Sequence, residues 1–188
     1  MRYVLQGLLI ITLISLGSGD ASAQELGIDF KGKYKKPTVN QRLLGDNVAM
    51  VNNERNDYAT NLVAYAVNTV RASKADQESL DLARNILGLA LHLSPRNKKC
   101  VVVNAQLARG VLPDLVVADY KQEVFASLLL ARGQLLEKNE QEINQTLARY
   151  FIALSAVIDP RNEDAVYESE LRRIDHGNLA WKLFTDEK

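Results

Sequence analysis

The sequence is poor in the residues on which many catalytic and metal sites depend. Its 188 residues include one cysteine, Cys100, and two histidines. One cysteine cannot form a disulfide within the chain, and a zinc site normally needs about four nitrogen or sulfur ligands. A catalytic site that depends on histidine would likewise have few candidate residues. We therefore expect no metal, no cofactor and no disulfide framework.

Charge and motif content exclude further classes. The formal net charge is zero, which gives the chain as a whole no electrostatic reason to bind nucleic acid. The sequence contains no glycine-rich phosphate loop and no HExxH box. Apolar residues make up 47% and charged residues 24%, a balance typical of a folded soluble protein rather than a disordered one.

The first 23 residues have the pattern of a secretion signal. An arginine precedes an apolar run from Val4 to Leu16, and Ala21–Ala23 offers small residues where a signal peptidase inspects the chain. We expect cleavage before Gln24 and a secreted or periplasmic protein. A retained anchor is the alternative, but the apolar run is shorter than the roughly 20 residues that span a bilayer. The pattern therefore predicts no stable membrane span after cleavage.

Residues 24–56 show no sustained periodicity of apolar residues and are interpreted as an extended basic arm. The arm contains four closely spaced lysines: Lys31, Lys33, Lys35 and Lys36. Such lysines can contact phosphate or an anionic cell-wall polymer. The simpler interpretation is a solvated, mobile tether, because runs of charge are usually solvated.

Helical periodicity begins near Asp57. Apolar residues then recur at three- and four-residue steps, and Ser73–Asp76 breaks the pattern and can cap a second helix. Pro95 ends that second helix, and Asn97 is placed to cap a third. The valines at 101–103 alone would favour a strand, but the segment 65 residues later has a helical pattern, so we predict a helix here.

Three further helices are predicted in the second half of the chain. The fourth is expected from about Asp119 to Glu137, and the sixth after Asn162. Asn139 and Glu142 resemble a capping pair that opens the fifth helix, which Pro160 ends. The predicted inward residues of the fourth helix are Val124, Leu128, Ala131 and Leu135.

Two stretches echo each other at a constant displacement of 65 residues: Leu82–Arg84 with Pro95–Asn97, and Leu147–Arg149 with Pro160–Asn162. A fixed displacement of this kind is the mark of a helical repeat array. Within these stretches, small, bulky and small residues and a proline recur at one spacing: Ala83, Leu87, Ala90, Pro95, and Ala148, Ile152, Ser155, Pro160.

On these residues, the chain resembles the tetratricopeptide-repeat family over roughly residues 57–174. The resemblance implies an all-α fold, a right-handed stack of about three helical hairpins within residues 57–188. It also implies a concave groove, lined by the first helix of each hairpin, in which ligands bind. The aromatic tail with Trp181 and Phe184 is expected either to cap the stack or to dock a partner or a second copy of the chain.

The groove candidates lie on the first predicted helix at steps of three, four and three, with one more on the third helix: Tyr58, Asn61, Tyr65, Asn68 and Asn104. Asparagine amides can bond the backbone of an extended peptide, and tyrosine adds flat contact area. The alternative is an ordinary solvated helix face.

These observations predict a secreted, non-catalytic module that binds a protein or peptide, with a homo-oligomer as a further expectation. A second hypothesis is a cell-envelope assembly or anchoring factor that uses the arm from Lys31 to Lys36. A third is a small hydrolase that uses the acidic cluster at 163–170. Carboxylates at a helix start more often complement the helix dipole, so this third hypothesis is the weakest.

Overall fold

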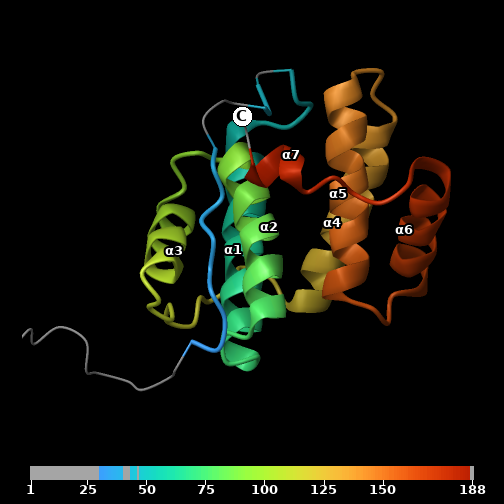
Figure 1. Cartoon of the computed structure of the whole chain (residues 1–188). Coiled ribbons are helices and arrows are strands. Elements are labelled where there is room, and N and C mark those ends of the chain that lie inside the picture. Colours follow the sequence, from blue (N-terminus) through green and yellow to red (C-terminus); the bar gives the residue numbers. More distant parts are fainter. Residues whose placement is uncertain (1–29, 40–42, 46, 187–188) are drawn as a thin grey trace, which may run out of the picture.

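The computed structural model describes residues 30–39, 43–45 and 47–186 (Figure 1). It contains the helices α1 (Asn52–Ala72), α2 (Gln77–Leu93), α3 (Lys98–Ala108), α4 (Gln122–Glu137), α5 (Glu142–Ile158), α6 (Glu163–His176) and α7 (Lys182–Thr185). No strand occurs in this part of the chain, where Thr38 and Asp186 form one isolated bridge. The all-α prediction is confirmed. The predicted signal peptide and its cleavage site lie outside the described residues.

Helices α2 and α3 begin at the side-chain caps that were expected, and α6 begins after Asn162 as predicted. The carboxylate of Asp76 accepts a hydrogen bond from the Ser79 N–H at 2.9 Å. Asn97 caps α3 and Asn162 caps α6 in the same way, at 3.0 and 3.1 Å. Each cap satisfies a main-chain N–H that has no partner within the helix. The helix over the valines at 101–103 is confirmed as well.

Other helix starts differ from the prediction. Helix α1 begins at Asn52, five residues early, because Arg55 is buried and donates to the carbonyls of Leu93 and Leu44 at 2.9 and 2.6 Å. Asn139 does not cap α5, since the N-cap residue is Gln141. The side chain of Asn139 instead accepts from the Gln141 N–H at 3.0 Å.

The predicted inward face of α4 is wrong. Val124, Ala131 and Leu135 are exposed, and Leu128 is half-buried. Helix α4 begins at Gln122 rather than Asp119, and its inward residues are Phe125, Ala126, Leu129, Gly133 and Leu136. The helix is apolar on both sides, so its sequence pattern leaves the rotation open.

The helices form two antiparallel hairpins, each with one flanking helix (Figure 1). Helices α1 and α2 make the first hairpin, and α4 and α5 make the second. Helix α3 packs against α1 and α2, whereas α6 packs against α5. Helix α3 therefore does not pair with α4, as three successive hairpins would require. The connection 109–121 carries the chain across α1 instead.

The displacement of 65 residues extends to the helix bounds. Helices α2 and α5 both have 17 residues, and α5 begins 65 residues after α2. Helix α6 follows α3 by the same interval, and both start after an asparagine cap. The two halves of the chain thus share local structure, although each flanking helix lies on the side away from the other hairpin (Figure 1).

Aromatic residues join the two hairpins. Tyr58 on α1 stacks on Phe151 of α5 with ring centroids 5.2 Å apart. The tail folds back over both hairpins, and the buried ring of Phe184 contacts His92 of α2 and Tyr150 of α5 edge-on. The tail therefore lies between the hairpins rather than at one end of a stack.

Docking of α7 depends on Gly88 in the middle of α2. A Cβ at this position would lie 2.6 Å from the carbonyl oxygen of Phe184 and 2.9 Å from Thr185 Cγ2. Alanine in a helix normally gains about 1 kcal/mol over glycine. Here the overlap with the main chain of α7 outweighs that gain, because overpacking costs about 1–3 kcal/mol.

We predict that Gly88→Ala lowers the free energy of unfolding and changes the fluorescence of Trp181, the only tryptophan, which packs edge-on against Tyr150. The matched control is Gly45→Ala, whose Cβ meets no atom within 4 Å. Urea unfolding followed by tryptophan emission makes the comparison. Equal stability of the two variants would contradict the packing of α7 described here.

Candidate functional site

The predicted row on α1 faces the rest of the protein rather than open solvent. Asn61 is 2% exposed, and Tyr58, Tyr65 and Asn68 are half-buried. The side chains of this row face the connection 109–121 and the second hairpin. It is therefore not the solvated helix face that was the alternative interpretation.

Asn61 holds the end of the connection. Its Oδ1 accepts a hydrogen bond from the main-chain N–H of Asp119 at 3.0 Å. Its Nδ2 donates to Oδ2 of the same aspartate at 3.2 Å and to the Asp57 carbonyl at 2.9 Å. One buried amide thus fixes both the backbone and the side chain of Asp119.

Two other α1 residues hold the same segment further along. Asn68 Nδ2 donates to the carbonyl of Val116 at 3.5 Å, and Arg71 donates to the carbonyl of Pro113 at 2.5 Å. Residues 113–119 have no helix or strand hydrogen bonds of their own. Side chains of α1 therefore bind an extended main chain, which is the mode predicted for a peptide. The main chain that they bind here is the protein's own connection, at residues 113–119.

Beside this segment lies an open pocket of about 490 Å³. Its lining includes Asn61, Tyr65 and Asn68 of α1, together with Tyr120 and Phe125. The buried Oδ1 of Asn68 has no hydrogen-bond partner among the described residues. The pocket thus offers aromatic surface, and its lining residue Asn68 has a buried amide oxygen without a donor.

Tyr58 does not belong to this pocket. Its ring packs between Phe125 and Phe151, and its hydroxyl donates to the Leu128 carbonyl at 3.2 Å. Burial is the main cause that raises the pKa of Tyr58 to about 12. Tyr58 therefore serves the contact between the hairpins.

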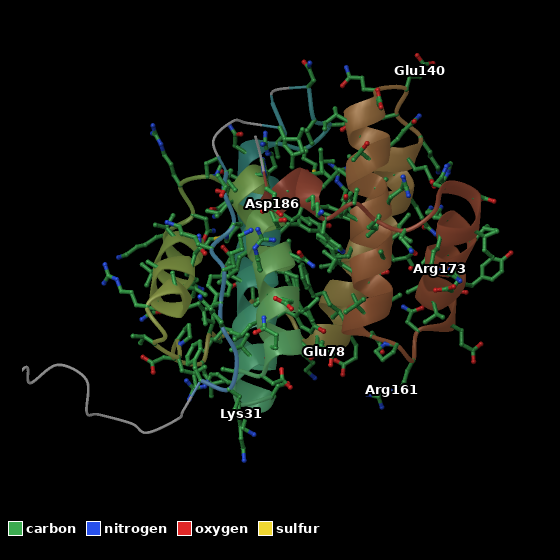
Figure 2. The ribbon with its side chains drawn as sticks, in the orientation of Figure 1. Lys31, Glu78, Glu140, Arg161, Arg173 and Asp186 are labelled. Carbon is green, nitrogen blue, oxygen red and sulfur yellow. The ribbon has the colours of Figure 1, made fainter. Side chains whose placement is uncertain are left out.

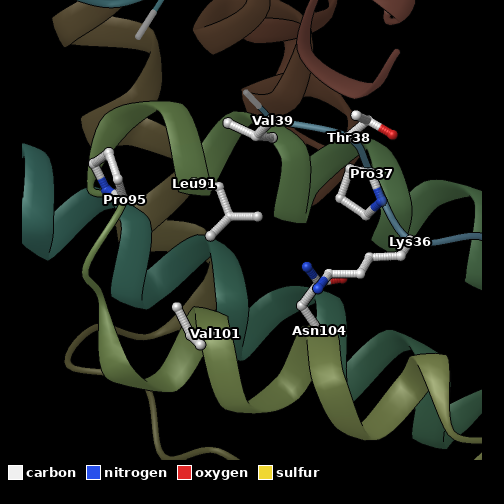
Figure 3. A pocket seen from close by; sticks show the side chains of 8 residues that line it. All are labelled: Lys36, Pro37, Thr38, Val39, Leu91, Pro95, Val101 and Asn104. Carbon is white, nitrogen blue, oxygen red and sulfur yellow. The ribbon is translucent and has the colours of Figure 1, made fainter. Parts of the chain in front are cut away.

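Asn104 lies apart from the α1 row and holds a different extended segment. It is buried on α3 and accepts a hydrogen bond from the Tyr34 hydroxyl at 2.8 Å. Beside it is a second pocket of about 440 Å³, with Leu91 of α2 and Val101 of α3 on opposite sides (Figure 3). Burial also raises the pKa of Tyr34.

Within the predicted arm, residues 30–39 have no helix and pack against the protein rather than forming a solvated tether. The N–H groups of Gly32 and Thr38 donate to the carbonyls of Ala75 and Thr185 at 3.0 and 2.9 Å. The tether interpretation missed Gln77, whose side-chain amide accepts from the Lys33 N–H at 2.9 Å and donates to the Lys33 carbonyl at 3.3 Å. A lone glutamine at a helix start gives no sequence signal for such a role.

The four arm lysines differ in their surroundings. Lys35 forms an ion pair with Asp186 at 3.3 Å. Lys31, Lys33 and Lys36 are exposed, and Lys31 points away from the helices (Figure 2). The lysines are therefore carried by a packed segment, and Lys36 lines the second pocket, where its side chain extends toward Asn104 (Figure 3).

No strongly nucleophilic side chain lines either pocket. Cys100 is buried, and its Sγ lies 3.7 Å from the Leu87 carbonyl oxygen. Burial raises the pKa of its thiol from 9.0 to about 12. In the described part of the chain, no three His, Cys, Asp or Glu residues lie together as metal ligands would, and no helix has the length and apolar character needed to cross a bilayer.

Comparison with known proteins found no matching family model, no matching curated protein and no matching solved structure.

Removal of the Asn61 side chain should release the connection. We predict that Asn61→Ala lowers the free energy of unfolding by about 0.5–1.5 kcal/mol, because Asp119 is exposed and its main-chain N–H loses a part-buried hydrogen bond. Limited proteolysis should then cut faster between residues 109 and 121. Asn53→Ala, at an exposed position of the same helix, is the control and should leave both measurements unchanged.

Burial of Cys100 also predicts a pH dependence. A thiol in the unfolded chain ionises near pH 8.5, whereas the folded thiol stays protonated to about pH 12. The unfolded state thus binds fewer protons than the folded state above about pH 8.5, and the free energy of unfolding falls as the pH rises, by up to about 1.4 kcal/mol per pH unit.

Urea unfolding between about pH 8 and 10 should show this fall in the wild type and a shallower fall in Cys100→Ala. A thiol reagent should leave the native wild type unmodified at about pH 8. Rapid modification of the native protein would contradict the burial of Cys100.

Proposed function

We propose that this protein is an exported, non-catalytic module that binds an extended segment of another protein or a peptide in the pocket beside α1. The observation that carries the proposal is the row of α1 side chains that already bind extended main chain at residues 113–119. The same chemistry is available in the neighbouring pocket, where Asn68 Oδ1 still lacks a donor among the described residues.

A ligand strand would lie against the connection and the aromatic wall. One backbone N–H of the ligand would donate to Asn68 Oδ1, so that a buried acceptor without a donor gains a hydrogen bond. An apolar ligand side chain would pack on Tyr65, Tyr120 and Phe125. Tyrosine gives such a contact area at a small cost in side-chain entropy.

Two sequence features support the wider proposal. The equal lengths of α2 and α5 and the asparagine caps of α3 and α6, both at a displacement of 65 residues, support a helical-repeat origin related to the tetratricopeptide-repeat unit, in which binding of other chains is common. The apolar run before Ala21–Ala23 supports export.

Site-specific crosslinking can identify the ligand. A photoreactive residue at Ala72, on the exposed rim of the pocket, should capture a partner from envelope extract, and mass spectrometry of the crosslink should give the bound segment. The same probe at Asn53, outside the pocket, is the control and should not capture that segment.

The captured segment, made as a synthetic peptide, should bind the wild type more tightly than Asn68→Ala or Tyr65→Ala. We expect about tenfold weaker binding for Asn68→Ala, since one hydrogen bond contributes about 1–1.5 kcal/mol. Asn53→Ala should bind like the wild type. Equal affinity of all four proteins would overturn the assignment of the pocket.

A further inference from the structure

The two flanking helices present outer faces that no described element covers. Helix α3 lies at one side of the molecule and α6 at the opposite side (Figure 1). Helix α3 packs on α1 and α2, and helix α6 packs on α5. The arm also contacts α3, through the hydrogen bond from Tyr34 to Asn104. Both outer faces are therefore accessible at the same time, from opposite directions.

The outer face of α6 carries an apolar stripe. Tyr167 is 66% exposed and Ile174 is 72% exposed, with Leu171 between them. These residues follow one another at steps of four and three, which places them on one side of the helix. Ala165 is the buried residue of α6 in the structure, so most of the helix faces outward.

The outer face of α3 is the counterpart of this stripe. Val102 is 45% exposed, whereas its neighbour Val101 lines the second pocket. Val102 lies 65 residues before Tyr167, at the same turn of the equivalent helix. Each outer face therefore offers apolar area at a matching height along its helix.

Charge distinguishes the two faces. Helix α3 begins with Lys98 and Lys99, and the equivalent positions of α6 are Glu163 and Asp164. None of these four forms an ion pair with another described residue. Lysines at a helix start oppose the helix dipole, so their position in α3 does not serve the stability of that helix.

The far ends of the two helices do not repeat the contrast. Arg109 follows the last turn of α3, and the last turn of α6 holds Asp175 together with the basic residues Arg173 and His176. The contrast in charge therefore lies at the first turns of the two helices. Opposite charges meet there when the two helices run parallel to each other.

We propose that the outer face of α3 docks on the outer face of α6 in a second copy of the same chain. The two patches differ, so the contact is head-to-tail and generates an open chain or a closed ring of copies. The complementary surface is on the same chain, which favours a second copy over a different acidic or basic partner. Contact between two single helix faces is small, below roughly 1,200 Å², so the association is reversible.

Sedimentation velocity over a concentration series tests this assembly. At about 50 mM salt we expect the sedimentation coefficient of the purified protein to rise with concentration, and at about 500 mM salt we expect the rise to disappear. Protein that stays monomeric at every concentration in low salt would overturn the proposal.

Two charge-reversed variants identify the partner. Lys98→Glu with Lys99→Asp makes both faces acidic, and Glu163→Lys with Asp164→Lys makes both faces basic. Each variant alone should lose self-association. An equimolar mixture should regain it, because every contact between the two variants then joins opposite charges.

Ile174→Ser should weaken assembly of the otherwise unchanged protein, since it removes apolar contact and leaves the charges in place. Circular dichroism and the Tm verify that each variant is folded. A folded pair of charge variants that stays monomeric when mixed would overturn the proposal. Retention of the wild type on polyaspartate without self-association would also overturn it and would assign the α3 face to an anionic polymer.

Discussion

The structure depends on side-chain amides that hold extended main chain against helices. Residues 113–119 have polar backbone groups with no secondary-structure partners, and groups of this kind must be satisfied when they approach a protein surface. Asn61 provides the buried partner for Asp119, and Arg71 provides the partner for Pro113. This contact leads the chain across α1 and so determines where the second hairpin begins.

The same device recurs at the amino-terminal arm. Gln77 bonds the backbone of Lys33 through both ends of its amide, and Asn104 accepts from the hydroxyl of Tyr34. Each segment lies beside an open pocket. Some of the side chains that hold the segment also line the pocket. This arrangement is the basis of the proposal that the protein binds an extended segment of another chain.

Local features of the fold could be predicted from the sequence, because their partners lie three residues away. The caps at Asp76 and Asn97 are of this kind. The rotation of α4 could not be predicted, because it depends on Gly133, whose missing Cβ lets Ile152 approach. The asparagines of α1 were identified by their spacing, but their occupant was not, since Asp119 lies 58 residues from Asn61.

The most direct measurement of the central contact is a through-hydrogen-bond scalar coupling by NMR. If Asn61 holds the connection as described, the amide nitrogen of Asp119 will show a cross-peak to the side-chain carbonyl carbon of Asn61. The Asp119 amide proton will also exchange slowly with solvent. A missing cross-peak together with exchange at the rate of an unfolded chain would show that α1 does not bind extended main chain.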